Sequence, residues 1–354
     1  MPELFDPQPK DDPRVLYGRE KELAELTNHI EEKRWVVLLG PRRIGKTSLA
    51  RCAARALGYQ CVVADAREDS DLAHALVSSL TATREEASVS ARAGFQVPQR
   101  PISVDVAYSK SFLTSTLDRL LEDKRKKRRL VVLLDEAQWF RNPRGVVKLL
   151  AHVYDYHYEK ATFVITGSAV GVMRSITEPE ARSALFGRAL TMMEVERWSP
   201  SVSLGFLREG CKEKKLPYDE GRMARVVDEI GGIPGWLTLF GYHYAAMKTA
   251  TASITESALR KTKNEGMKII RDELESVSRI AAGWERQMNI LKELASGPKR
   301  FTELAETSGL PNTVLTRHLT MLHRLRYIEH DREERYVIID PMLRDFLRKE
   351  RSSQ

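Results

Sequence analysis

The apolar positions of the first half of the chain follow two kinds of pattern. Short, nearly continuous apolar runs at 35–39, 61–64, 130–134 and 162–166 are typical of strands that are buried on both faces of a parallel sheet. Between them, apolar residues recur at helical spacing, as in the segment 46–57 that follows the first run. Strands that alternate with helices predict an α/β domain whose parallel sheet carries helices on both faces.

Beyond residue 198 the predicted strands give way to helices. Ser199-Pro200 and Asp219 are helix starts, because Ser and Asp accept hydrogen bonds from free amides and proline fits the first helical position. Gly231-Gly232 ends the second of these helices, and Pro234 begins a third. An all-helical stretch of this kind is typical of a lid or linker domain.

From Trp284 onward the pattern changes again. Three predicted helices, at 286–295, 301–308 and 311–326, precede two short strands that flank a polar turn. This order predicts a winged helix-turn-helix. We therefore expect an N-terminal extension, an α/β domain, a helical lid domain and a winged-helix domain, at residues 1–16, 17–197, 198–282 and 283–354 respectively.

One motif joins the first predicted strand to the helix that follows it. It has the pattern G-x-x-x-x-G-K-T of a Walker phosphate loop and consists of Gly40, Pro41, Arg42, Arg43, Ile44, Gly45, Lys46 and Thr47. The glycines let backbone amides face phosphates, Lys46 places a charge beside the β- and γ-phosphates, and the Thr47 hydroxyl can bind Mg²⁺. Because the motif lies between a predicted strand and a predicted helix, we expect the chain to bind ATP or ADP with Mg²⁺.

Two carboxylates end the third predicted strand. Asp135 is predicted to hold Mg²⁺, and Glu136 is predicted to polarise the attacking water as a general base. Thr166 or Ser168, at the end of the next strand, is a candidate for orienting that water, although small polar residues also end strands for turn reasons alone. Arg188 is a candidate sensor of the γ-phosphate, in its own chain or in a neighbouring one, against the alternative of an ordinary surface arginine.

Together these segments resemble the archaeal ATPases of the AAA+/STAND group, relatives of the origin-recognition ATPases. The resemblance covers roughly residues 15–350 and is carried by the segments 17–20, 40–48, 134–138, 166–168, 185–188 and 231–235. It implies that Gly18 and Arg19 lie near the adenine or ribose, that Pro234 packs near the adenine, and that Ser48 completes the phosphate loop. It also implies a lid over the nucleotide, and arrangements of the lid and C-terminal domain that depend on the nucleotide.

The helix predicted at 311–326 is basic on the face opposite its leucines. That face carries Thr313, Arg317, Thr320 and Arg324. On the second helix of a helix-turn-helix, such side chains suit contacts with bases and phosphates in the major groove of duplex DNA. Winged helices also pack against proteins, and the predicted wing tip at 331–334 is acidic, so docking to a protein or within the chain is an open alternative.

Composition narrows the class of protein. The chain has 354 residues, and its apolar runs are all too short to span a membrane. The three cysteines have no CxxC spacing, and the N-terminus lacks the pattern of a signal peptide, so we expect a cytoplasmic protein without a membrane partner. The net charge of +8 is compatible with nucleic acid but identifies no partner. Part of it comes from the basic run 124–129, which is either a solvated loop or a nucleic-acid contact.

These observations predict an ATPase that converts ATP and water to ADP and phosphate, slowly and with stimulation by a partner. The favoured function is a nucleotide-driven switch that associates with double-stranded DNA through the winged helix. The alternative is a STAND-type signalling switch that engages a protein partner and does not bind DNA. Both a monomer and a nucleotide-dependent oligomer are compatible with the sequence.

Overall fold

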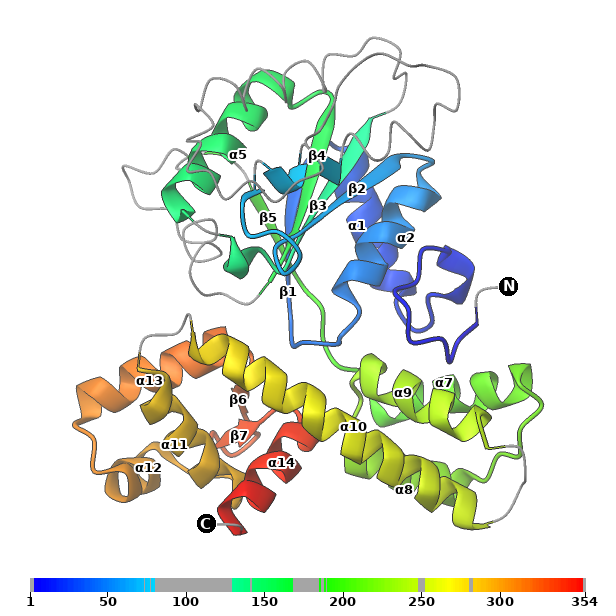
Figure 1. The fold of residues 1–354 in the computed structure, drawn as a ribbon, viewed down its shortest axis with the longest axis vertical. Helices are drawn as coiled ribbons and strands as arrows, with labels where there is room; N and C mark the ends of the chain where they lie inside the picture. Colours follow the sequence, from blue (N-terminus) through cyan, green and yellow to red (C-terminus); the bar gives the residue numbers. More distant parts are fainter. Residues whose placement is uncertain are drawn as a thin grey trace, which may run out of the picture.

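The computed structural model describes residues 3–72, 74–76, 78–79, 129–140, 142–167, 185, 188, 190–247, 252–279 and 283–352. These residues form two lobes (Figure 1). The upper lobe holds a parallel sheet with helices, and the lower lobe holds helices and one small hairpin. Most of the basic run, at 124–128, lies outside the described residues.

The sheet of the upper lobe confirms the predicted α/β fold. Its five parallel strands lie in the order β2-β3-β4-β1-β5. The bounds are Trp35–Leu39 for β1, Gln60–Asp65 for β2, Leu130–Asp135 for β3, Ala161–Thr166 for β4 and Leu190–Glu194 for β5. Val37 of β1 pairs with Ile165 on one side and Met192 on the other, which puts the strand before the phosphate loop well inside the sheet.

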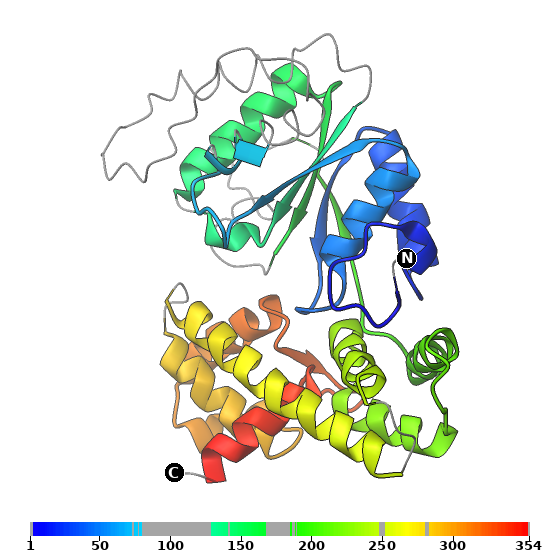
Figure 2. The same cartoon turned by 45° about the vertical axis from the view of Figure 1, so that its right-hand side comes forward.

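Helices cover both faces of this sheet, as Figures 1 and 2 show. The helices α1, at Glu20–Glu31, and α2, at Lys46–Ala56, bury Leu26 and Leu49 against one face. The helix α5, at Pro143–His157, covers the other face, which includes Trp35 and Phe163. Two short 3-10 helices, η1 at Pro13–Val15 and η2 at Ala137–Trp139, complete the lobe.

The lower lobe begins with the predicted lid helices. They are α7 at Pro200–Glu213, α8 at Glu220–Ile230, α9 at Pro234–Ala245 and α10 at Ala252–Ser278. The predicted caps are confirmed, since the side chain of Ser199 accepts the Val202 amide and that of Asp219 accepts the Arg222 amide. Because these caps bond free amides at the first turn, they fix where α7 and α8 start.

The winged helix-turn-helix follows in the predicted order. Its helices and strands are α11 at Trp284–Ala295, α12 at Phe301–Ser308, α13 at Asn312–Arg324, β6 at Ile328–His330 and β7 at Tyr336–Ile338. A final helix, α14 at Pro341–Ser352, packs against α10 and α11. No helix within the described ranges combines the length and the apolar character that a membrane crossing requires.

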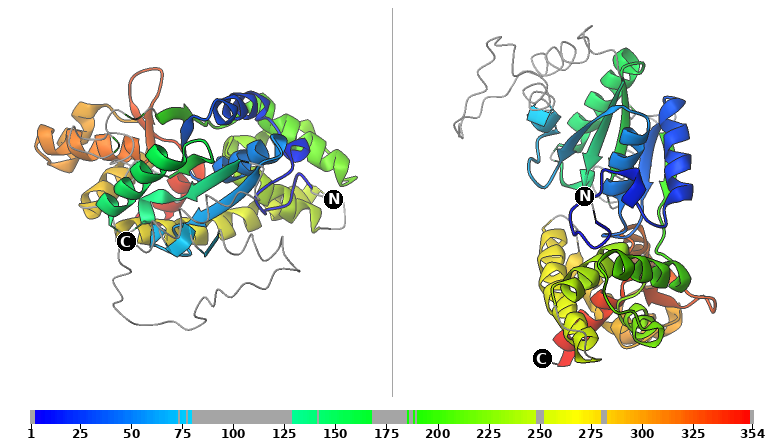
Figure 3. Two further views of the ribbon diagram at one scale, coloured as in Figure 1. Left: turned by 90° about the horizontal axis from the view of Figure 1, so that it is seen from above. Right: turned by 90° about the vertical axis from the view of Figure 1, so that its right-hand side faces the viewer.

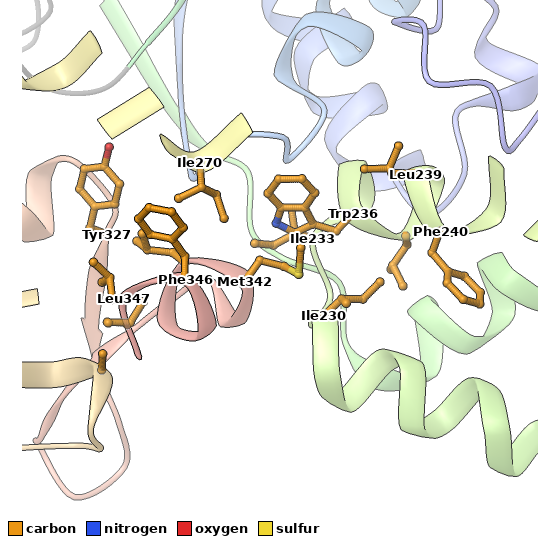
Figure 4. Packing of buried hydrophobic residues seen from close by; sticks show 14 of the residues in the cluster. Ile230, Ile233, Trp236, Leu239, Phe240, Ile270, Tyr327, Met342, Phe346 and Leu347 are labelled. Carbon is orange, nitrogen blue, oxygen red and sulfur yellow. The ribbon is translucent and has the colours of Figure 1, made fainter. Parts of the chain in front are cut away.

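One hydrophobic core runs through the whole lower lobe. Figure 4 shows Trp236 of α9, Ile270 of α10 and Met342 of α14 close together. A Cβ on Gly266 of α10 would lie 2.3 Å from Cε of Met342, so the backbone of α10 is in direct contact with α14. The 27-residue helix α10 (Figure 3) thus joins the lid helices to the winged helix without a break in the core.

The N-terminal extension crosses from one lobe to the other. Phe5 is 3% exposed, and its ring lies where a Cβ on Gly210 of α7 or on Gly241 of α9 would be, 2.2 Å from either position. Further along, the Lys10 amide donates to the Ser48 hydroxyl of α2 at 3.0 Å. The segment 3–12, which we call the strap, therefore ties the lid to the helix that follows the phosphate loop. Its Pro- and Asp-rich sequence has no periodicity from which this packing could be predicted.

Candidate nucleotide-binding site

The phosphate loop lies between the end of β1 and the start of α2. Its glycines are required by geometry, because Gly45 has φ +96° and a Cβ on Gly40 would lie 2.4 Å from the Val195 carbonyl oxygen. Lys46 is buried, and its Nζ donates to the carbonyl oxygens of Gly40 at 3.0 Å and Pro41 at 2.8 Å. Burial lowers the pKa of Lys46, and an anionic group placed beside it would offset that effect.

The carboxylate of Asp135 faces this loop from the end of β3. It is 4% exposed, and it accepts hydrogen bonds from the Thr47 hydroxyl at 2.9 Å and from the Thr166 hydroxyl. A carboxylate and a hydroxyl in contact are oxygen donors of the kind that Mg²⁺ prefers, so this pair fits the predicted metal. No group of three or more His, Cys, Asp or Glu side chains in the described part of the chain could hold a metal ion.

Glu136 begins the turn that follows β3. Its backbone is left-handed, with φ +52°, and its amide donates to the Thr166 hydroxyl at 3.2 Å. Thr166 therefore contacts both consecutive acidic residues. Of the two hydroxyls that the sequence leaves open, Thr166 lies in this network, whereas Ser168 lies outside the described residues. The role of either hydroxyl stays a prediction.

Arg188 lies far from this network. It comes two residues before Leu190, which pairs with Trp35 at the amino end of β1, whereas the phosphate loop lies at the carboxyl end. Its guanidinium pairs with Asp155 of α5 at 2.6 Å. Arg188 therefore does not reach the phosphate loop of its own chain in this arrangement, and contact with the nucleotide of a neighbouring chain stays a prediction.

The segments that resemble adenine-binding motifs lie beside the loop. Arg19 is 4% exposed and donates to the carbonyl oxygens of Ile44, in the phosphate loop, and Glu196. Its neighbour Gly18, with φ +60°, accepts a hydrogen bond from the Trp198 indole through its carbonyl oxygen. In these contacts Arg19 supports the loop backbone, and a direct contact with the base stays a prediction.

Pro234 is the first residue of α9, next to the phosphate loop. The amide of the following residue, Gly235, donates to the Arg43 carbonyl oxygen at 2.9 Å. A Cβ on Gly235 would lie 2.7 Å from Cβ of Arg43, so only glycine permits this approach. The lid thus touches the loop through backbone at this point.

The structure adds site residues that the sequence analysis missed. Arg67, just after β2, pairs with Asp65 and lies 3.8 Å from the Asp135 carboxylate. Its position just after the carboxyl end of a parallel strand could have identified it as a site residue, because ligands bind at that edge of such sheets. Glu273 of α10 lies 3.3 Å from Arg42 and 3.2 Å from Arg43, but nothing local distinguishes it from other glutamates of that helix.

The winged helix exposes the predicted basic face. Thr313, Arg317 and Thr320 of α13 are exposed and Arg324 is half-buried, whereas the leucines of the opposite face are buried. In the wing, Asp331 accepts hydrogen bonds from the Arg335 side chain and amide. Whether these four residues contact DNA stays a prediction.

Two family models match the chain. Residues 16–240 match an ATPase domain found predominantly in Archaea. Residues 285–332 match an IclR helix-turn-helix domain, which includes α11, α12 and α13. No curated protein sequence matches this chain.

Solved structures share the fold over almost the full length. A Walker-type ATPase of Pyrococcus abyssi is 25% identical, with a TM-score of 0.76 over 98% of this chain and 99% of that one. The Aeropyrum pernix ORC2 protein, in ADPNP–ADP complexes, is 14% identical, with a TM-score of 0.63 over 99% and 98%. The Aeropyrum pernix ORC1 protein, in complex with DNA, is 16% identical, with a TM-score of 0.52 over 99% and 97%.

Proposed function

Because this chain belongs to the family of ATPase domains found predominantly in Archaea, we propose that it is a Mg²⁺-dependent ATPase that acts as a DNA-associated switch. The observation that carries the chemistry is the contact of Asp135 with the hydroxyls of Thr47 and Thr166, next to the buried amine of Lys46. A phosphate loop, a carboxylate at the neighbouring strand end and a polar network between them are what hydrolysis of a γ-phosphate requires.

Each residue of this network has a role in hydrolysis. The loop amides and Lys46 hold the β- and γ-phosphates and stabilise the charge that develops on them. Mg²⁺, held by Thr47 and Asp135, would supply positive charge next to the same phosphate oxygens. Glu136 accepts a proton from water as the water oxygen bonds to the γ-phosphorus. The bond from that phosphorus to the bridging oxygen breaks, and ADP and phosphate leave.

The association with DNA rests on α13 and the helix-turn-helix that holds it. The exposed Thr and Arg side chains of this helix can reach base edges and phosphates in a major groove. The Aeropyrum pernix ORC1 protein, which has the same fold, binds DNA in its solved structure. A slow reaction that duplex DNA accelerates would connect this surface with the phosphate loop.

One observation favours a second candidate, a signalling switch that engages a protein. The wing between β6 and β7 carries three acidic residues, Asp331, Glu333 and Glu334, against Arg332 and Arg335, and Arg335 pairs with both Asp331 and Glu333. A wing of this charge would be repelled by DNA phosphates, while a basic protein surface would attract it.

Steady-state ATP hydrolysis with and without duplex DNA, at low and moderate salt, separates the two candidates. Lys46→Ala should abolish binding and hydrolysis, and Glu136→Gln should keep ATP binding and lose hydrolysis. Arg317→Ala should remove stimulation by DNA and lower the salt slope of binding by about one. Arg222→Ala, an exposed arginine of α8, is the control with the same change of charge. Turnover that is indifferent to DNA would favour the signalling switch, and hydrolysis by Glu136→Gln would refute the role of the base.

A further inference from the structure

The two arginines of the phosphate loop point into the lower lobe. The carboxylate of Glu273 forms ion pairs with both arginines. Its Oε1 lies 3.3 Å from Nε of Arg42, and its Oε2 lies 3.2 Å from an η-nitrogen of Arg43. The Glu273 side chain is only 10% exposed, and those of the arginines are 25% and 26% exposed. The guanidinium of Arg43 also lies over the ring of Trp236, 4.5 Å from its centre. These partly desolvated contacts are screened less than surface pairs.

Arg42 has a second acidic neighbour in the upper lobe. Its η-nitrogen lies 3.6 Å from Oε2 of Glu136, the proposed general base. Burial lowers the pKa of Arg42, but the carboxylates of Glu273 and Glu136 outweigh burial and raise it overall. Arg42 is therefore a cation shared between the catalytic carboxylate and α10.

Glu273 also connects this cation to the winged helix. The hydroxyl of Tyr327 donates to Oε1 of Glu273 at 3.3 Å, and Tyr327 follows α13 after a turn of two residues. Its neighbour Arg326 pairs with Glu194 at the end of β5. Figures 1 and 2 both show α13 on the side of the lower lobe that faces the sheet. A chain of contacts therefore runs from the end of α13 through Tyr327 and Glu273 to Arg42 and Glu136.

The space at this junction is small. The cavity that Pro41, Arg42, Glu273 and Tyr327 line has a volume of about 20 Å³, which has room for about one water molecule. A phosphate group can therefore contact Arg42 from this cavity only if it displaces the Glu273 side chain.

We propose that Arg42 is a positioning residue for Glu136, and that Glu273 holds it in a resting position while the winged helix packs on the phosphate loop. This inference rests on the proposed hydrolysis by Glu136. The positive charge of Arg42, 3.6 Å from the Glu136 carboxylate, favours the ionised form of that carboxylate and makes it a weaker acceptor of a proton from water. When the lower lobe moves and Glu273 leaves, Arg42 exchanges its carboxylate partners for oxygens of the nucleotide phosphates, and Glu136 becomes free to act on water.

The test is the substitution Glu273→Gln, which keeps the shape and an acceptor for Tyr327 but removes the charge. KM for ATP should fall about three- to tenfold, the range for a partly screened charge pair, and kcat without DNA should rise. Both effects should shrink at high salt. Glu275→Gln on the same helix is the matched control, because Glu275 is exposed and the change of charge is equal. Combined with Arg42→Gln, Glu273→Gln should change KM less than it does alone, because only its contact with Arg43 then remains.

The outcomes are distinct. A residue that only stabilises the fold would lose ATP affinity when it is replaced, so a gain of affinity at an unchanged melting temperature supports the proposal. An unchanged or weaker affinity in Glu273→Gln, an equal gain in Glu275→Gln, or additive effects with Arg42→Gln would overturn it. If the unmodified chain does not hydrolyse ATP above the level of Lys46→Ala, the proposed function fails, and titration with a fluorescent ATP analogue still decides whether Glu273 restrains Arg42.

Discussion

Removal of the Phe5 ring is expected to detach the strap. The ring is 3% exposed and packs edge-on against Phe206, with centroids 5.6 Å apart, in a notch left by Gly210 and Gly241. Loss of a buried phenylalanine side chain costs about 3–5 kcal/mol where the surrounding structure does not collapse into the space. The backbones of α7 and α9 line the notch at Gly210 and Gly241, so a collapse would require these two packed helices to shift.

The other contacts of the strap cannot replace this ring. Its polar contacts include the hydrogen bonds from the Lys10 amide to Ser48 and from the Leu4 amide to Glu213, and the pairs of Glu3 with Lys214 and of Asp11 with Arg55. These groups are half-buried or exposed, and ion pairs and hydrogen bonds that water still reaches contribute little to stability. At about 1.4 kcal/mol for each factor of ten, loss of about 3 kcal/mol raises the detached population about a hundredfold.

Hydrogen exchange measures this population directly. In Phe5→Ala, the protection of the Leu4 and Lys10 amides should fall by about two orders of magnitude, while that of β1 stays unchanged. Gly210→Ala should give the same result from the other side of the notch, because its methyl group would occupy the position of the ring. Gln8→Ala, at an exposed position, is the control. Unchanged protection of Lys10 in Phe5→Ala would refute the reasoning, since it would mean that the strap is held by its polar contacts.

Three further substitutions test the site and its surroundings. Thr166→Val removes the hydroxyl that joins Asp135 to the Glu136 amide, so kcat should fall about tenfold or more with little change of KM, whereas Thr162→Val on the same strand should leave kcat unchanged. Gly235→Ala forces a methyl group against Arg43 at a cost of about 1–3 kcal/mol, and ATP affinity measured by titration should fall about tenfold; unchanged affinity would contradict the close approach. Burial raises the pKa of Asp340 to about 6, above its pKa in the unfolded chain. Protonation of Asp340 therefore stabilises the folded state fully below the unfolded pKa, and this stabilisation is lost as pH rises through 6. Between pH 7 and pH 5 the unmodified chain should therefore gain about 1 kcal/mol relative to Asp340→Asn in thermal unfolding, and parallel pH profiles would refute this assignment.

The parts that could be predicted from sequence are those whose signal is local. The phosphate loop combines two glycines, Lys46 and Thr47 within eight positions, and the strands β1 to β4 are short, nearly continuous apolar runs. The strand β5 lies at one edge of the sheet and was not predicted, because only Met193 among its five residues is buried. A strand with one buried side chain has no continuous apolar run to detect, unlike β2 at the other edge.

The remaining site residues depend on contacts between distant segments. Glu273 looks like any glutamate of a long polar helix, and its partners lie 230 positions away in the sequence. Phe5 is a single aromatic residue among prolines and acids, and its notch is formed by glycines of two other helices. Such contacts arise from the packing of distant segments, so neither the periodicity nor the composition of the sequence predicts them.

The continuous core around α10 has a consequence for how the chain unfolds. Since Gly266 is in contact with both Trp236 and Met342, removal of α14 would expose apolar surface on α9 as well. The lid and the winged helix are therefore expected to unfold together, as one cooperative unit, and the sheet with its helices as another. Calorimetry should accordingly show two transitions, and a fragment that ends before α14 should fail to form a stable lid.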